Sequence, residues 1–240
     1  MEKIIFLADL HGNMPATLAM EEEIERLRVD DIWFLGDAVG KGPESDKTCD
    51  WVRSHCKHFI AGNWDYVLCE SNKEKLLHYF KFYWDQIGDE RFSWLERLPH
   101  EASVWISGIN FRLIHGRPVD QLYFGFDSEE KLSAGFRSAD GSQTYGGLIC
   151  ADSHMPFVRS IGLGYAVNTG SVGNSIGVPK AHALLIEGEL GSVVPAPIRM
   201  TILSVPYDNK KAAEIAEDYP QLPDMKAYQK EVMTGVYARL

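Results

Sequence analysis

The chain has 240 residues, enough for one sizeable α/β domain, and we predict a single domain over residues 1–240. Its composition, 45% hydrophobic and 24% charged, is typical of a globular protein. A formal net charge of −10 argues against non-specific binding to nucleic acid or to an anionic membrane, because no overall positive field attracts a polyanion.

Targeting signals are not evident in the sequence. We find neither a signal peptide nor an apolar run of the roughly 20 residues needed to cross a bilayer. The four cysteines lack the close CxxC spacing of a zinc or redox site. We therefore expect a cytoplasmic protein with reduced thiols and no membrane partner.

The first hundred residues alternate short apolar runs with stretches of helical periodicity. This pattern is typical of strands that are joined by crossover helices and buried on both faces. We predict strands over residues 3–8, 31–35 and 58–61, and helices over residues 14–28 and 45–57.

The segment 71–100 is predicted to be helical and is unusually rich in aromatic residues. We interpret its rings as core against a sheet and not as a base-stacking surface, because the chain is acidic.

The second half of the chain carries mostly strand-like patterns. We predict a hairpin of strands 102–107 and 111–114 that turns at 108–110, and further strands at 147–150, at the start of 166–173, and at 181–187 and 199–205. Residues 206–240 are expected to form a helical extension packed on the outside.

Polar side chains follow three successive strands of the first half. Asp9 and His11 come directly after the first strand, and Asp37 and Asn63 follow the next two. The pair Asp9 and His11 alone could equally be a helix cap and a surface loop residue. Ligands of open α/β sheets bind at the carboxyl ends of the strands, so three such ends in succession favour a shared site.

Two later strands end in the same way. His115 follows one strand, and Asp152 and His154 follow another. Carboxylates, an amide oxygen and imidazoles suit Mn, Fe, Zn or Mg, and there are enough of them for two ions that share one carboxylate. Two such ions, roughly 3.5–4 Å apart, generate a nucleophile from water and stabilise the oxygens of a transferred phosphoryl group.

Five motifs in this order resemble the signature of the calcineurin-like metallophosphoesterases, over most of residues 1–175. They are Asp9-Leu10-His11, Gly36-Asp37, Gly62-Asn63, His115 and Asp152-Ser153-His154. Two further stretches, 36–43 and 168–173, resemble the small prokaryotic members, including the YfcE-like phosphodiesterases. The resemblance implies a four-layer α/β/β/α sandwich of two mixed sheets flanked by helices, with a dinuclear metal site whose bridging hydroxide is the nucleophile.

The resemblance also implies the ligand sets. The first metal would be held by Asp9, His11, Asp37 and His154, and the second by Asp37, Asn63, His115 and Asp152, with Asp37 bridging. The catalytic core would be Asp9, His11, Asp37, Asn63 and His115. The expected cofactors are two divalent ions, Mn being favoured over Fe, Ni, Zn and Mg.

Two positions depart from the family pattern. Asp152 stands where an imidazole is usual, which adds negative charge and favours Mn or Mg at the second position. Trp64 replaces a His that protonates the leaving group in many members, a role that an indole cannot take. We therefore expect a preference for leaving groups that depart without an acid.

Four residues are predicted to contact the substrate: Asn13, Lys41, Trp64 and Arg117. Asn13, Lys41 and Arg117 each follow a ligand-bearing strand end, and Arg117 offers a fork suited to phosphate. The alternative for each of these three is a solvated loop residue.

The leading hypothesis is a metal-dependent phosphoesterase that cleaves phosphodiester or phosphoanhydride bonds of a small phosphorylated or nucleotide substrate. A dinucleoside polyphosphate hydrolase and a serine/threonine-phosphatase-like monoesterase are alternatives. A different class also stays open, namely a non-catalytic metal-binding scaffold of the same fold. The sequence does not decide between a monomer and a homo-oligomer.

Overall fold

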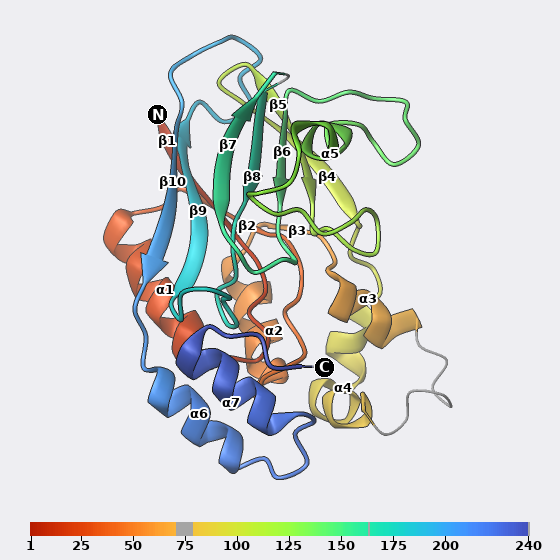
Figure 1. The fold of residues 1–240 in the computed structure, drawn as a ribbon, viewed down its shortest axis with the longest axis vertical. Coiled ribbons are helices and arrows are strands. Elements are labelled where there is room, and N and C mark those ends of the chain that lie inside the picture. The colour runs from red at the N-terminus through yellow and green to blue at the C-terminus, as the bar shows by residue number, and fades with distance from the viewer. Residues whose placement is uncertain (71–78, 163, 240) are drawn as a thin grey trace.

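A computed structural model describes residues 1–70, 79–162 and 164–239 and contains two five-stranded mixed sheets (Figure 1). The first sheet has the strand order β10-β9-β1-β2-β3. Its strands are β1 (Glu2–Leu7), β2 (Asp31–Phe34), β3 (His58–Phe59), β9 (Ala181–Gly188) and β10 (Arg199–Val205). Strands β1, β2 and β3 run parallel, whereas β9 pairs antiparallel with β1 and β10.

The second sheet has the order β4-β5-β6-β8-β7. Its strands are β4 (Glu101–Ile106), β5 (Ile109–Ile114), β6 (Gly147–Cys150), β7 (Phe157–Ile161) and β8 (Gly164–Asn168). Strands β5, β6 and β8 are parallel, so their carboxyl ends point the same way.

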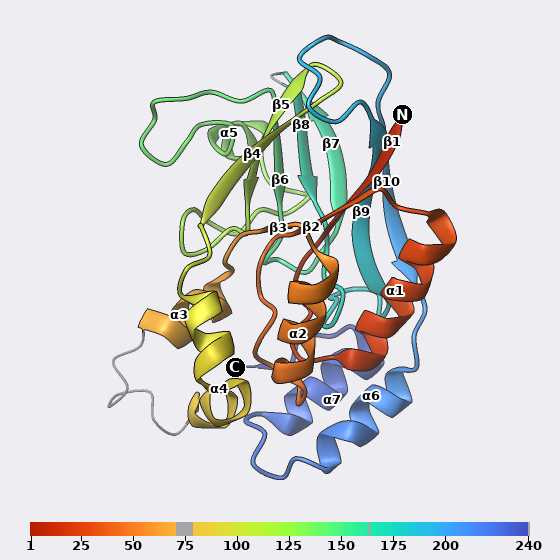
Figure 2. The same ribbon diagram turned by 180° about the vertical axis from the view of Figure 1, so that it is seen from behind.

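Seven helices accompany the sheets in the described part of the chain. They are α1 (Met14–Leu27), α2 (Ser45–His55), α3 (Asn63–Glu70), α4 (Lys81–Leu95), α5 (Glu129–Ala134), α6 (Asn209–Glu217) and α7 (Met225–Thr234). Figures 1 and 2 show α3, α4 and α7 gathered below the sheets, in the half of the molecule that holds the end of the described chain. Among the described residues, no helix has both the length and the apolar character of a membrane span.

Three buried clusters show how the layers stack. Alternate residues of β1 point to opposite faces: Ile5 and Leu7 pack toward the helices, while Ile4 and Phe6 pack toward the second sheet. On the far face of that sheet, Leu132 of α5 closes a third cluster. The order helix, sheet, sheet, helix confirms the predicted α/β/β/α class.

Three details differ from the expected elements. Strand β7 and helix α5 were not predicted. The hairpin turns at Ser107 and Gly108, because Ile106 already pairs with Ile109. Helix α4 is interrupted at Gly88, which has a positive φ of 67°. Residues 71–78 of the predicted aromatic helix lie outside the described residues, but Tyr83 of α4 is fully buried in the core, as expected.

Candidate metal centre and its cavity

The strand ends bring all seven predicted ligands to one place between the two sheets. After β1 and β2 the chain continues the pairing, with the backbone N–H of Asp9 donating to Gly36 O at 2.9 Å and that of His11 to Asp37 O at 3.2 Å. The second sheet contributes His115 after β5 and the loop of Asp152 and His154 after β6.

Five of these residues have left-handed backbone conformations. The φ angles are 56° for Asp9, 47° for His11, 61° for Asp37, 64° for Asp152 and 59° for His154. Asp and His tolerate this region better than most residues, and such conformations cluster at functional sites. Close packing also explains the glycine before Asn63, because a Cβ at Gly62 would lie 2.1 Å from Oδ1 of Asp37.

The three histidines present the same ring nitrogen to the site. Nδ1 of His11 lies 2.8 Å from Val39 O, and Nδ1 of His115 lies 2.7 Å from Leu35 O. Nδ1 of His154 contacts the carbonyl of Asn174. A carbonyl only accepts, so each Nδ1 carries a hydrogen, and Nε2 is the nitrogen turned to the site that can give a lone pair to a metal, which is the usual arrangement of a ligating imidazole.

The first ligand group consists of Asp9, His11 and His154. Nε2 of His11 and Nε2 of His154 are 3.3 Å apart, and Oδ1 of Asp9 is 3.2 Å from the latter and 3.5 Å from the former. Both carboxylate oxygens of Asp9 are buried without a hydrogen-bond partner among the described residues. Buried acceptors that face one another in this way fit a cation between them.

The second ligand group lies beside the first. Nε2 of His115 is 3.4 Å from Oδ2 of Asp37 and 3.7 Å from Oδ1 of Asp9. The amide atom placed as Oδ1 of Asn63 is 3.2 Å from this Nε2, and also 3.2 Å from Asp37 Oδ2 and Asp152 Oδ1. Without a cation the amide would turn its nitrogen to these acceptors, whereas a cation would keep its oxygen there.

A metal ion fits both groups. In each of the triads Asp9-His11-His154 and Asp9-Asp37-His115, the candidate ligand atoms lie within 4.8 Å of one another. The triads share Asp9, while Oδ2 of Asp37 is also only 3.6 Å from Nε2 of His11. Both carboxylates thus reach both groups, and the role of Asp37 as the bridge stays a prediction.

The charges in this buried cluster are coupled. Burial lowers the pKa of His11 to about 4, with the charge of Lys41 acting in the same direction. Burial also acts to lower the pKa of His115, but Asp37 and Asp9 raise it well above its ordinary value. Burial would raise the pKa of Asp9, yet the charges of His154 and His115 hold it well below its usual range. The carboxylates of Asp37 and Asp9 therefore favour a positive charge beside His115.

Asp152 is engaged by Arg117. Oδ2 of Asp152 accepts from the backbone N–H and Nε of Arg117 at 3.0 and 2.9 Å, and Oδ1 accepts from Nη2 at 2.7 Å. The same Oδ1 lies 3.9 Å from Nε2 of His115. The side chain of Asp152 is 2% exposed and that of Arg117 is 51% exposed. The guanidinium thus offsets the extra charge that Asp152 brings in place of an imidazole.

Asp65 supports the loop that carries Asp37. Its carboxylate is fully buried and accepts from the backbone N–H groups of Asp37 at 2.8 Å, Ala38 at 3.1 Å and Gly62 at 3.0 Å. This residue lies in the first turn of α3, so it ties the strand end of β2 to that of β3.

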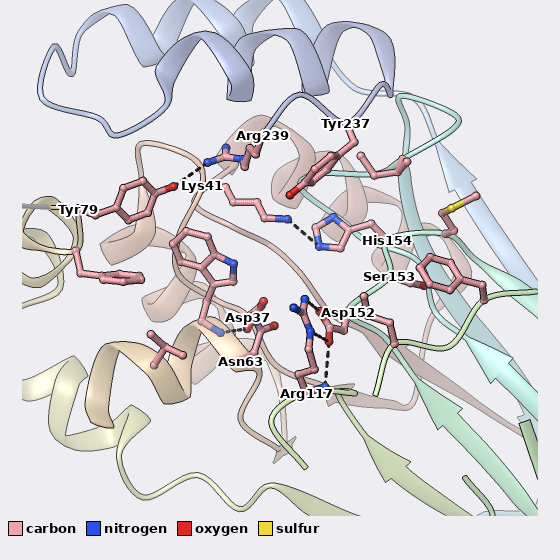
Figure 3. Close-up of a pocket in the computed structure, with 17 residues that line it drawn as sticks. Asp37, Lys41, Asn63, Tyr79, Arg117, Asp152, Ser153, His154, Tyr237 and Arg239 are labelled. Carbon is pink, nitrogen blue, oxygen red and sulfur yellow. Dashed lines mark hydrogen bonds and ion pairs between the residues drawn. The ribbon is translucent and has the colours of Figure 1, made fainter. Parts of the chain in front are cut away.

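A cavity of about 560 Å³ opens next to the ligands (Figure 3). Three of the four predicted substrate contacts, Lys41, Trp64 and Arg117, line it. Nζ of Lys41 is buried and lies 3.1 Å from Nε2 of His154. Burial lowers the pKa of Lys41 to about 8, helped by the charge of Arg239.

The fourth predicted contact, Asn13, lies outside the cavity lining. Asn13 is fully buried and is not among the residues that line the cavity. Its Oδ1 caps α1 by accepting from the N–H of Ala16, and its Nδ2 donates to Gly173 O at 2.7 Å. The preference of Asn for helix N-caps explains the position without any ligand.

Sequence reasoning missed the rest of the cavity lining. It is formed by aromatic and apolar side chains and one arginine from distant segments: Val67, Tyr79, Phe80, Leu122, Phe124, Met155, Ile176, Tyr237 and Arg239. These positions share no spacing that marks them in the sequence, because they meet only after α4 and the segment after α7 have folded against the sheets.

Comparisons with known proteins agree with this geometry. The calcineurin-like phosphoesterase superfamily domain matches residues 2–189. The uncharacterized protein MJ0912 of Methanocaldococcus jannaschii is 27% identical over 235 residues, which cover 88% of this chain and 90% of that protein.

Two solved structures match almost the whole chain. The metallophosphoesterase of Sphaerobacter thermophilus has a TM-score of 0.75 and 22% identity, and the match covers 98% of this chain and 99% of the other. The hypothetical protein PH1004 of Pyrococcus horikoshii has a TM-score of 0.80 and 22% identity, with 99% and 100% covered. At this identity the two structures support the fold.

The chain belongs to the calcineurin-like phosphoesterase superfamily, because the family's domain spans most of its length. This membership and the two-sheet fold confirm the resemblance drawn from the five motifs. The candidate metal-ligating residues lie together as that resemblance implies. The individual ligand roles remain predictions.

Proposed function

We propose that this protein is a metal-dependent hydrolase of phosphodiester or phosphoanhydride bonds. The observation that carries the proposal is the pair of adjoining ligand triads that share Asp9, whose carboxylate oxygens have no hydrogen-bond partner in the described part of the chain. Two divalent ions held there, for which we favour Mn, would supply a nucleophile from water and neutralise charge on the phosphoryl oxygens.

The residues around the ligands have distinct roles in this proposal. If Nε2 of His154 held a metal, Lys41 would lose its contact with that nitrogen, and its ammonium would be available to a phosphoryl oxygen. Arg117 stands at the rim with a half-exposed fork that is already oriented by Asp152. Both cations would orient a phosphoryl group next to the ligand cluster.

Trp64 supports the preference for good leaving groups. Its ring lies 5.9 Å from that of His11, edge to face, and faces the cavity. The indole cannot protonate a departing oxygen. An aryl ester or an anhydride would therefore react faster than an alkyl monoester, which favours a diesterase or anhydride hydrolase over a monoesterase.

A panel of substrates tests the proposal. The protein is loaded with Mn, Mg, Ni or Fe and assayed with bis-p-nitrophenyl phosphate and with glycerol phosphate at neutral pH. We expect hydrolysis of the aryl diester and at least roughly hundredfold slower release of phosphate from glycerol phosphate.

The controls separate the site from the rest of the chain. Asp37→Asn should abolish turnover, whereas Asp218→Asn, at an exposed position, should leave it unchanged. Equal rates on both substrates would contradict the assigned role of Trp64. A protein that neither binds any of the four metals nor turns over either substrate would point to the scaffold alternative.

A further inference from the structure

Arg239 lies in the segment that follows α7, residues 235–239, which returns to the cavity (Figure 3). The side chain of Arg239 is only 9% exposed. Its Nε donates to Oε2 of Glu231 at 3.1 Å, and Nη1 lies 3.4 Å from the hydroxyl of Tyr79. Its Nη2 is buried and has no hydrogen-bond partner within the described ranges.

Hydrogen bonds to Glu231 fix the position of Arg239. Glu231 of α7 is fully buried and also accepts from the N–H of Ala238 and from Nδ2 of Asn174, both at 3.1 Å. Asn174 in turn contacts Nδ1 of His154 through its carbonyl. A chain of hydrogen bonds therefore connects the guanidinium to a candidate metal ligand, so Arg239 is held at a set place relative to the centre.

A buried guanidinium N–H without an acceptor is costly, and a carboxylate or phosphoryl oxygen is the partner that matches its fork. Both arginines line the cavity, Arg117 beside Asp152 and Arg239 farther away, beside Tyr79 (Figure 3). Arg117 is already paired with Asp152. Arg239 is paired with Glu231 and lies 3.8 Å from Oδ2 of Asp224, but its Nη2 has no acceptor among the residues that the structure describes. In a chain of net charge −10, this cavity therefore offers a second place for an anion, separate from the ligand cluster.

The aromatic rings beside Arg239 indicate which kind of molecule would carry the anionic groups. Trp64, Tyr79 and Tyr237 line the same cavity, and the rings of Trp64 and Tyr79 lie 6.2 Å apart. Aromatic walls of this kind suit a nucleobase, which stacks on them whatever its hydrogen-bonding pattern.

We propose that Arg239 binds a second anionic group of the substrate, so that the substrate is a nucleotide carrying two phosphoryl groups. The proposal rests on the proposed function for one of the two phosphoryl groups, the one that would be cleaved at the ligand cluster. The group bound by Arg239 does not depend on that function. Arg239 thus determines specificity, and it comes from outside the residues 2–189 that define the family domain.

The test compares ligands that differ in one phosphoryl group. Binding of thymidine 5′-phosphate, thymidine 5′-diphosphate and thymidine 3′,5′-bisphosphate to the Mn-loaded protein is measured by calorimetry. We expect Arg239→Gln to weaken one or both of the doubly phosphorylated ligands by roughly ten- to hundredfold and to leave the monophosphate within about twofold.

Two further variants complete the design. Arg199→Gln removes a surface arginine whose side chain is 71% exposed and should change none of the affinities. Arg239→Lys keeps a cation against Glu231 and should fold even where Arg239→Gln does not, with a smaller loss confined to the same ligands.

The outcomes separate the two proposals. An equal loss for all three ligands, no loss for any, or no binding by the unmodified protein overturns the role of Arg239. Selective loss of binding in a protein that hydrolyses nothing would refute the proposed function and leave the second anion site standing.

Discussion

Asp152 stands between two partners, a guanidinium and a candidate metal position. Its Oδ1 accepts from Arg117 at 2.7 Å while lying 3.9 Å from Nε2 of His115. Burial would raise the pKa of Asp152, but the hydrogen bonds from Arg117 and the charge of His115 lower it below its ordinary value. The carboxylate is thus kept ionised and available as an oxygen ligand, at the cost of sharing it with a cation.

Asp152→Ala separates these two roles. If Asp152 is a ligand, Mn bound per chain should fall from two toward one, because losing a ligand costs more than the roughly 10–100-fold in affinity that outer partners contribute. Metal content is measured by elemental analysis after dialysis.

Arg117→Gln is the matched comparison, because it removes the same ion pair and leaves the carboxylate in place. It should retain two ions while weakening substrate binding. If Asp152→Ala and Arg117→Gln have the same metal content, Asp152 only orients Arg117 and is not a ligand.

At the scale of elements, His182 connects strand β9 to strand β10 and to the loop that carries Ser175. From β9 its Nδ1 lies 2.8 Å from the hydroxyl of Ser175 and its Nε2 lies 3.1 Å from that of Ser204 on β10. Burial, with the charge of Lys180 second, lowers the pKa of His182 to about 4. The neutral ring therefore belongs to the folded state.

This shift predicts a specific dependence of stability on pH. The unfolded chain takes up a proton near the ordinary value of 6.5, and the folded protein does so only near 4. The contribution of His182 is thus fully present above pH 6.5 and is lost as the pH falls toward 4. Between pH 7 and pH 4.5, His182→Gln should lose about 1–2 kcal/mol less free energy of unfolding than the unmodified protein.

Urea unfolding at the two pH values measures this difference. At pH 8 both proteins carry a neutral group at position 182, so their difference there reports packing alone. A variant whose stability declines with acid as steeply as that of the unmodified protein would show that other groups, and not His182, govern this range.

The elements that the sequence predicted well are those with strong patterns. Buried parallel strands such as β1, and the polar residues directly after them, follow from hydrophobicity and from the geometry of parallel sheets. Strand β7 was missed because it lies at a sheet edge and is only half-buried, with Val158 41% exposed. Helix α5 is too short, at 6 residues, to show helical periodicity.

The candidate ligands of the site were predicted from the sequence, whereas the remaining lining of the cavity was not. Each ligand follows the end of a strand, so local sequence places it. Arg239 meets Tyr79 across 160 residues of chain, and only the packing of α7 brings it to the cavity. The capping role of Asn13 did not follow from its spacing, because the same type of residue contacts substrates and caps helices.

At the scale of the whole molecule, the candidate metal centre joins the two sheets. Asp9, Asp37 and their neighbours come from the first sheet, whereas His115 and His154 come from the second. Cations held between them would bind only the folded arrangement and would therefore stabilise both sheets together.

Removal of metal tests this link. Chelation should lower the midpoint of thermal unfolding by roughly 5–10 °C relative to the Mn-loaded protein, in one calorimetric transition. Asp9→Asn should show no shift on addition of Mn or of chelator. If Mn does not change the midpoint of thermal unfolding of the unmodified protein, or shifts only one of two transitions, the centre is not shared by both sheets.

The left-handed backbone of the ligand loops also limits how this centre can diversify during evolution. At Asp152, with φ of 64°, most residue types would pay about 1–2 kcal/mol of backbone strain, whereas Asp, Asn, His and Gly pay less. Three of these four are metal ligands of different charge and hardness. Replacement of Asp152 by Asn or His would therefore change the charge and hardness offered to a cation while the loop keeps its shape.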